Sequence, residues 1–189
     1  MQPFCHIQLA TTRLALRPLR MEDAESLLHI YSDPEFTRYW SCEPWIALKQ
    51  ATELIENDLR NHAAGECLRL GVFLRNGEVL IGTCSLFNFV PSCRRSELGY
   101  GIAREYWRQG YMFEAVSAVL RLAFEDLGLH RVEADVDPRN TASVRGLKKL
   151  GFKREGYLRE RWIVGAEVSD SAIYGLLARE WKAGELGTV

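Results

Sequence analysis

A glycine-containing turn near the middle of the chain joins a predicted strand to a predicted helix. The strand reads Glu97-Leu-Gly-Tyr-Gly-Ile102 and the turn reads Trp107-Arg-Gln-Gly-Tyr-Met112. The first N–H groups of a helix lack partners and carry the positive end of its dipole, so they favour an anion. Gly110 lets the backbone approach phosphate oxygens, and Arg104 or Arg108 could neutralise a second phosphate. The segment therefore fits a diphosphate, although Gly110 alone could simply make the turn.

This turn lies inside a predicted β-α-β unit. Residues 96–102 and 131–136 are predicted strands, and residues 113–127 place apolar side chains at helical spacing. Strands joined in this way lie parallel, with a right-handed crossover. The turn then faces the carboxyl-terminal edge of the first strand, where we expect the anion.

The remaining segments predict an antiparallel half beside this parallel centre. Asn76-Gly77 favours the positive φ angles of a two-residue hairpin turn. A helix over 47–64 is expected to bury an apolar stripe of Leu48, Ala51, Ile55 and Leu59. Further predicted elements are strands at 14–18, 68–74, 79–89, 154–163 and 168–177, and helices at 21–31 and 140–150. The chain is therefore expected to form an α/β fold around one mixed sheet.

Length and charge limit the classes of partner. A chain of 189 residues that is 47% hydrophobic suits one domain over residues 1–189, with its core at about 10–182. The net charge of −1 gives no general attraction to nucleic acid or to an anionic membrane. No apolar run reaches the roughly 20 residues of a membrane span. We expect no nucleic-acid partner and no membrane partner, and either a monomer or a homodimer.

The cysteines and histidines support neither a disulfide framework nor a metal site. The five cysteines form no Cys-x-x-Cys pair, and their odd number favours reduced thiols in a cytoplasmic protein. The four histidines are far apart in the sequence and none lies in a His-Glu-x-x-His arrangement. We therefore expect no metal.

The glycine-containing turn resembles the acyl-CoA-binding motif of the GNAT superfamily of N-acetyltransferases. That motif has Gln or Arg, two residues, Gly, one residue, and Gly or Ala. Trp107, Gly110 and Met112 stand at its three defined positions. The stretch from Tyr106 to Ala115 is also similar to the Rim-type branch, the ribosomal-protein N-terminal acetyltransferases.

A second stretch is similar to the next motif of the family, a helix that contacts the pantetheine arm. It reads Asn140-x-x-Ser143 and continues to Lys149-Leu-Gly-Phe152. The resemblance implies that Asn140 hydrogen-bonds the pantetheine and that Ser143 lies near the sulfur. From the residues alone, Asn140 is an N-cap and Ser143 an ordinary first-turn hydroxyl. Leu147 stands where many members have a tyrosine acid, which leaves Ser143 to steady the departing thiolate.

The resemblance implies a GNAT (acyl-CoA N-acyltransferase) fold, which is a single mixed β-sheet, centrally splayed and flanked by helices. The exposed edge of the splayed strand would pair with the pantetheine amides, and the implied cofactor is acetyl-CoA (coenzyme A). The implied cofactor-binding residues are Leu98, Gly99, Tyr100, Gly101, Ile102, Trp107, Arg108, Gln109, Gly110, Tyr111, Met112, Phe113, Asn140 and Ser143.

The implied reaction is direct attack of a neutral amine on an acetyl thioester in a ternary complex. A terminal amine, with a pKa of about 8, loses its proton more easily than a lysine at about 10.4. Glu97 matches an acidic position of the Rim-type branch and is the implied base, directly or through water. It could equally be an edge carboxylate paired with Arg94 or Arg95. The predicted catalytic residues are thus Glu97 and Ser143.

An aromatic cluster at residues 36–45 lies where the family places its acceptor wall. Tyr39 and Trp40 are predicted substrate contacts, Tyr157 could face them, and Glu35 would suit a cationic acceptor. Such aromatics could instead be core. The predicted acceptor is a protein N-terminal amine, and the alternatives are a polyamine, an aminoglycoside or an amino acid. A non-catalytic acyl-CoA-binding module is the alternative from another class.

Overall fold

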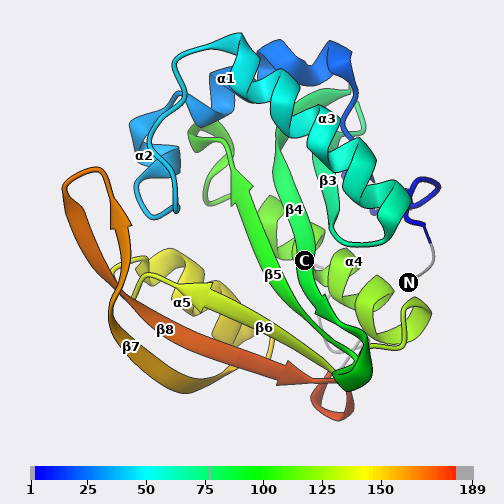
Figure 1. The fold of residues 1–189 in the computed structure, drawn as a ribbon. Helices are drawn as coiled ribbons and strands as arrows, with labels where there is room; N and C mark the ends of the chain where they lie inside the picture. Colours follow the sequence, from blue (N-terminus) through cyan, green and yellow to red (C-terminus); the bar gives the residue numbers. More distant parts are fainter. Residues whose placement is uncertain (1–2, 77, 182–189) are drawn as a thin grey trace.

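One mixed sheet of eight strands runs through the computed structural model, which describes residues 3–76 and 78–181 (Figure 1). The strands lie in the order β1-β2-β3-β4-β5-β6-β8-β7. They are β1 (Leu9–Ala10), β2 (Leu14–Arg17), β3 (Leu68–Leu74), β4 (Val79–Val90), β5 (Arg95–Ile102), β6 (Arg131–Val136), β7 (Lys153–Val164) and β8 (Glu167–Leu177).

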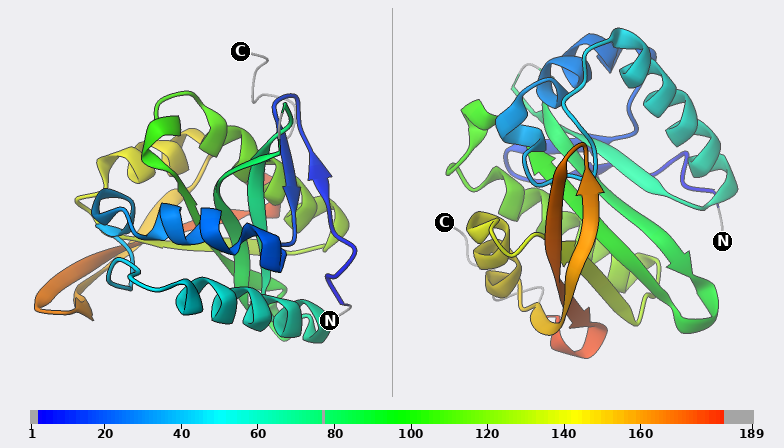
Figure 2. Two further views of the ribbon diagram at one scale, coloured as in Figure 1. Left: turned by 90° about the horizontal axis from the view of Figure 1, so that it is seen from above. Right: turned by 60° about the vertical axis from the view of Figure 1, so that its left-hand side comes forward.

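Helices cover both faces of this sheet. They are α1 (Ala24–Tyr31), α2 (Pro34–Thr37), α3 (Leu48–Ala64), α4 (Tyr111–Arg121) and α5 (Thr141–Lys149). The first three lie on one face, and α4 and α5 lie on the other (Figure 2). A 3-10 turn, η3 (Arg104–Tyr106), leads from β5 toward α4. None of the described helices combines the length and apolar character that crossing a membrane requires.

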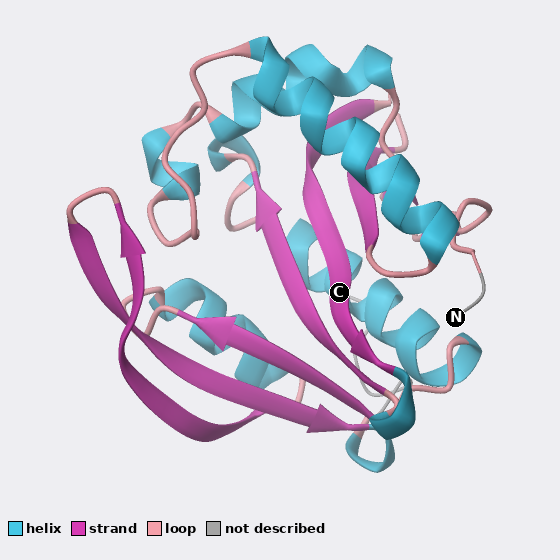
Figure 3. Cartoon of the chain, viewed as in Figure 1, coloured by secondary structure: helices cyan, strands magenta, loops and turns pink. Residues whose placement is uncertain are grey.

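The two central parallel strands pair only at one end. β5 and β6 are in register from Arg95 and Arg131 to Glu97 and Glu133. On its other side β5 stays paired with β4 as far as Ile102. Beyond Glu97, β5 and β6 move apart, and the divergence is visible in Figures 1 and 3. The predicted fold class, with its central splay, is confirmed.

The observed elements extend the predicted order in two places. The short hairpin strand β1 was not predicted, nor was helix α2. Asp33-Pro34 begins α2, because the Asp33 carboxylate accepts the backbone N–H of Glu35 at 2.9 Å and proline suits the first position of a helix. The predicted antiparallel pair is confirmed as β3 and β4, although Gly77 of its predicted turn lies outside the described residues.

The buried face of α3 agrees with the predicted stripe at Ala51 and Ile55, which are fully buried, and differs from it at the other two positions. Leu48 and Leu59 are 42% and 50% exposed, whereas Asp58 and His62 are buried. Arg69 on the neighbouring strand β3 explains the rotation. Its guanidinium donates to Asp58 Oδ1 at 2.7 Å, and its backbone N–H donates to His62 Nε2 at 3.1 Å. Buried polar groups need such partners, so the helix turns this side inward.

Candidate active site

A cavity of about 610 Å³ lies beside the unpaired end of β5, between α2 and the amino-terminal ends of α4 and α5. Thirteen residues predicted for the site line it: Tyr39, Trp40, Tyr100, Gly101, Ile102, Trp107, Arg108, Gly110, Tyr111, Met112, Phe113, Asn140 and Ser143. The residues predicted for the donor side and for the acceptor side therefore share one cavity.

The other predicted site residues, Glu97, Leu98, Gly99, Gln109 and Tyr157, lie outside this lining. Leu98 is buried in the core against α4. At Gly99, an added Cβ would lie 3.1 Å from atoms of Phe87 and Ser85, so the space there is already filled.

Sequence reasoning missed much of the wall. Glu35 and Phe36, from the predicted acceptor side, also line the cavity, and the lining residues that were not predicted are Arg38, Tyr106, Val116, Arg139, Thr141, Ala142, Arg145, Gly146 and Leu150. Helical spacing could have found two of them, because Gly146 and Leu150 lie three and seven residues after Ser143 on one face of α5. Arg139 carries no comparable local signal, since only the tertiary fold brings it to the cavity.

The glycine-containing turn at residues 107–112, called the phosphate turn from here on, has the backbone conformation that an anion site requires. Gly110 has φ +79° and caps α4, and Arg108 also has a left-handed φ of +62°. The first intrahelical bond runs from Glu114 N to Gly110 O at 3.1 Å. The N–H groups of residues 111–113 precede that bond and are available to an anion. The turn therefore fits a diphosphate-bearing ligand such as coenzyme A.

The turn is fixed to the end of β5 by the side chain at the first motif position. The indole N–H of Trp107 donates to the carbonyl of Ile102 at 2.6 Å. This bond joins the strand expected to meet the pantetheine to the turn expected to meet the phosphates.

An ion pair holds the same turn from the outside. Arg13, in the connection between β1 and β2, donates to Glu114 Oε2 at 2.6 Å and to the Gln109 carbonyl at 2.9 Å. Its guanidinium also lies 4.5 Å from the centre of the Tyr111 ring. Burial opposes ionisation of Glu114, but hydrogen bonds from Thr11 and Arg13 outweigh it and lower the pKa of this carboxyl.

Two hydroxyl groups and an amide meet at the first turn of α5. Asn140 caps the helix, as its side-chain oxygen accepts the Ser143 N–H at 3.0 Å. The Asn140 amide nitrogen keeps two N–H donors, so its predicted bond to the pantetheine stays a prediction. Tyr100 Oη lies 2.7 Å from Ser143 Oγ. Burial raises the pKa of Tyr100 to about 12, although its hydrogen bond with Ser143 acts in the opposite direction.

Glu97 lies where the parallel pairing of β5 ends. Its carboxylate accepts the Asn88 side-chain amide at 3.1 Å, while Arg95 donates to Glu133 at 2.6 Å instead. Three residues of extended strand, about 10 Å, separate Glu97 from Tyr100. A base at this position would reach an amine beside Ser143 only through water.

The acceptor side of the cavity is an aromatic wall. The rings of Phe36 and Trp40 stack with centroids 5.4 Å apart. A Cβ at Gly101 would lie 2.7 Å from both side chains, so the glycine lets this wall lie directly on β5. Arg139, from the opposite wall, lies 5.9 Å from the Tyr39 ring centre. An acceptor would therefore pass between aromatic rings and a guanidinium.

Arg139 also joins the cavity to the β7–β8 hairpin. It donates to Asp137 at 2.6 Å and lies 2.7 Å from Glu167 at the start of β8, and these contacts raise the pKa of its guanidinium. Tyr157 on β7 hydrogen-bonds Asp170 on the same hairpin. Its predicted contact with the acceptor stays a prediction.

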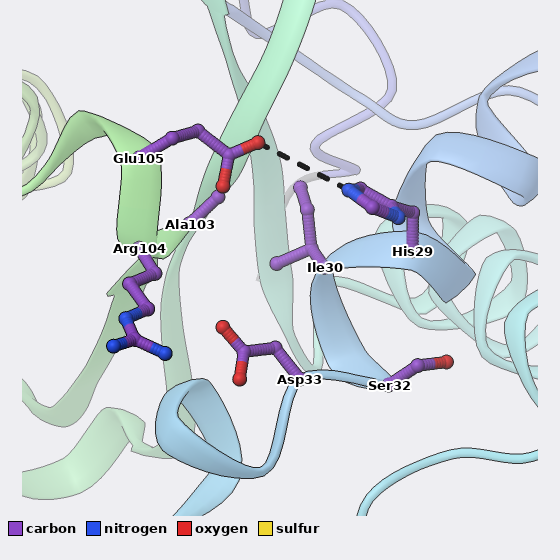
Figure 4. A pocket seen from close by; sticks show the side chains of 7 residues that line it. All are labelled: His29, Ile30, Ser32, Asp33, Ala103, Arg104 and Glu105. Carbon is purple, nitrogen blue, oxygen red and sulfur yellow. Dashed lines mark ion pairs between the residues drawn. The ribbon is translucent and has the colours of Figure 1, made fainter.

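A second hollow, of about 630 Å³, lies between the end of α1 and η3 (Figure 4). Its ionisable side chains are His29, Asp33, Arg104 and Glu105, and His29 Nε2 lies 4.0 Å from Glu105 Oε1. Arg104 therefore lines this hollow, whereas Arg108 lines the main cavity. Of the two predicted phosphate partners, only Arg108 lines the cavity beside the phosphate turn.

Gly110→Asp should abolish acetyl-CoA binding, because it places a carboxylate beside the N–H groups expected to meet the diphosphate. Gly128→Asp is a matched control, since Gly128 also has a positive φ of +62° and an added Cβ there meets nothing within 4 Å. Calorimetric titration measures both variants. Unchanged affinity in Gly110→Asp would overturn the position of the phosphate turn.

Arg13→Gln should weaken acetyl-CoA binding about fivefold, because a hydrogen bond to a charged group at a half-exposed site contributes about 1 kcal/mol. Binding of acetyl-pantetheine, which lacks the diphosphate, should not change. Arg75→Gln is the control, since Arg75 bonds the Thr11 carbonyl in the same region but is not among the contacts of the turn. An equal loss for both donors would contradict a role in positioning the phosphate turn.

Comparisons with known proteins identify the family of the chain. The acetyltransferase (GNAT) domain family matches residues 13–153. The N-acetyltransferase p20 of Bacillus licheniformis is 36% identical over 92% of this chain and 97% of its own length. The ribosomal protein uS5-alanine N-acetyltransferase of Escherichia coli is 29% identical, over 94% of each chain.

The solved structures of acetyltransferases share the fold. A GNAT-family acetyltransferase from Bacillus anthracis superposes with a TM-score of 0.82 at 26% identity, covering 92% of this chain and 100% of that one. The chain belongs to the GNAT family of N-acetyltransferases, enzymes that take their acetyl group from acetyl-CoA.

Proposed function

We propose that this enzyme acetylates the N-terminal α-amine of a protein, by direct attack of the amine on acetyl-CoA in a ternary complex. The single cavity that holds both donor-side and acceptor-side residues is the observation that carries the proposal. Two reactants held side by side need no covalent enzyme intermediate.

The donor would be held by backbone groups and a few side chains. The N–H groups of residues 111–113 and the Arg108 guanidinium suit the phosphates, and the unpaired edge of β5 suits the pantetheine amides. Acetyl-CoA supplies an activated acetyl thioester when it is bound. A backbone N–H of that strand would steady the charge that develops on the thioester oxygen.

The side chains on the acceptor side of the cavity suit the terminal amine of a peptide. The wall of Phe36, Tyr39 and Trp40 offers flat apolar surface, and Glu35 places a carboxylate at the same cavity. A terminal α-amine with a pKa of about 8 needs little help to lose its proton, which suits a base that acts through water. The relative from Escherichia coli is a ribosomal protein uS5-alanine N-acetyltransferase, which supports the same class of acceptor.

Glu97 is the proposed base, acting through water, and Ser143 the proposed donor to the departing thiolate. The aromatic and acidic side chains of the cavity would also accept a small polyamine, so the acceptor needs a direct test. A cytoplasmic location, and the choice between monomer and homodimer, stay predictions.

The test of the acceptor is release of free thiol from acetyl-CoA against matched acceptors. We expect release with peptides that begin with alanine or serine. We expect none with the same peptides carrying a blocked terminus and an internal lysine, because the lysine amine stays protonated. Release with polyamines or aminoglycosides, and not with peptides, would replace this proposal by acetylation of a small amine.

Glu97→Gln should lower kcat about 100-fold and leave acetyl-CoA affinity unchanged, as expected for a group that removes a proton. Glu35→Gln is the matched comparison, and it should raise KM for the peptide with little change in kcat. The dependence of kcat on pH is measured for each. If Glu97→Gln kept the wild-type rate at every pH, Glu97 would not be the base.

A further inference from the structure

Tyr100 links the two sides of the gap between the diverging strands β5 and β6 through its hydroxyl group. The side chain comes from β5, and its Oη lies 2.7 Å from the Oγ of Ser143 on α5, the helix that follows β6. In the described part of the chain, no other side-chain hydrogen bond links β5 with α5. Both residues line the cavity.

The Tyr100 hydroxyl is held where it is by packing on the ring. Its neighbours on the same face of the strand, Leu98 and Ile102, are buried in the core, and the Tyr100 ring packs against that core. The backbone of Ser143 is fixed as well, because Asn140 accepts its N–H. The Ser143 hydroxyl can still rotate about its Cα–Cβ bond.

The hydroxyl groups of Tyr100 and Ser143 carry more hydrogen-bond donors than the bond between them uses. Two hydroxyl groups carry two O–H hydrogens, and one hydrogen is enough for the bond between them. If Tyr100 donates to Ser143, the Ser143 O–H is left to a third group in the cavity. A chain of hydroxyls also polarises its terminal O–H, so that it becomes a stronger donor to a negative charge.

The reaction requires a donor at the leaving group. The amine nitrogen forms a bond to the acetyl carbon and loses one proton to the base, while the bond from carbon to sulfur breaks and sulfur keeps the electron pair. Tyr100 has a pKa of about 12, and a thiol has one of about 8.5, so proton transfer from the tyrosine to the thiolate is unfavourable. Leu147, at the position of the tyrosine acid found in many members, is fully buried.

We propose that Tyr100 is a positioning residue whose hydroxyl donates to Ser143 and thereby directs the Ser143 O–H to the thiolate of departing coenzyme A. The proton stays on Ser143, and the thiolate takes up a proton from solvent after release. The inference rests on the proposed acetyl transfer and adds to it the group that orients the thiolate donor.

The pKa of the thiol of bound coenzyme A tests this directly. It is titrated through the ultraviolet absorbance of the thiolate in the wild type, Tyr100→Phe, Ser143→Ala and the double variant. We expect a value below that of free coenzyme A in the wild type. Each single change should raise it by about one unit, which corresponds to a tenfold loss of thiolate stabilisation. The double variant should raise it no further, because the two hydroxyls act as one chain.

Turnover gives a second readout. Tyr100→Phe should lower kcat about tenfold without changing KM for acetyl-CoA, since the thiolate forms only during the reaction. Tyr174→Phe is the matched control, because Tyr174 is a buried tyrosine of the same core that does not line the cavity. In Tyr174→Phe, the pKa of the bound thiol and the kcat should both equal the wild-type values.

Three results would overturn the proposal. The first is a bound thiol that titrates like free coenzyme A in the wild type. The second is that the pKa of the bound thiol is raised in Ser143→Ala but is the same as in the wild type in Tyr100→Phe. If Tyr100→Phe fails to fold, the third result applies: the bound thiol of Ser143→Ala has the same pKa as in the wild type. Because the titration needs no acceptor, failure to find an amine substrate would affect the proposed function and leave this test intact.

Discussion

The separation of β5 from β6 is the constraint on which the rest of the structure depends. Parallel pairing stops at Glu97 and Glu133, yet β5 continues to Ile102 along β4. Backbone N–H and carbonyl groups away from water need hydrogen-bond partners. An extended ligand with alternating amide groups is therefore a natural partner for this stretch, and pantetheine is such a ligand.

Several contacts hold the splay in its open form. Trp107 ties the end of β5 to the phosphate turn, and Arg13 ties the turn to the β1–β2 connection. Across the gap, Tyr100 meets Ser143. The Arg13 and Tyr100 links join elements far apart in the sequence, whereas Trp107 and Ile102 are five residues apart. These links fix the walls of the cavity relative to one another, which favours preorganised catalysis.

Local sequence patterns predicted the helices and strands better than they predicted the side-chain contacts between them. The β-α-β unit and the phosphate turn follow from spacing and from a glycine that needs a positive φ, and the structure has both. The family motifs are continuous in sequence, and many of their residues line one cavity, while the binding roles of these residues stay predictions. The prediction for α3 was right at Ala51 and Ile55 and wrong at Leu48 and Leu59. Asp58 and His62 are buried because they find their partner on β3, which no helical pattern can reveal. Arg139 reaches the cavity for a similar reason, through the tertiary fold.

Hydrogen exchange of backbone amides with and without coenzyme A tests the central claim most directly. Binding should protect amides in residues 98–102 of β5, in residues 111–113 and at the first turn of α5, and it should leave the β7–β8 hairpin unchanged. Protection confined to those three segments would place the donor in the splay. Protection of the hollow between α1 and η3, with no change along β5, would contradict the account.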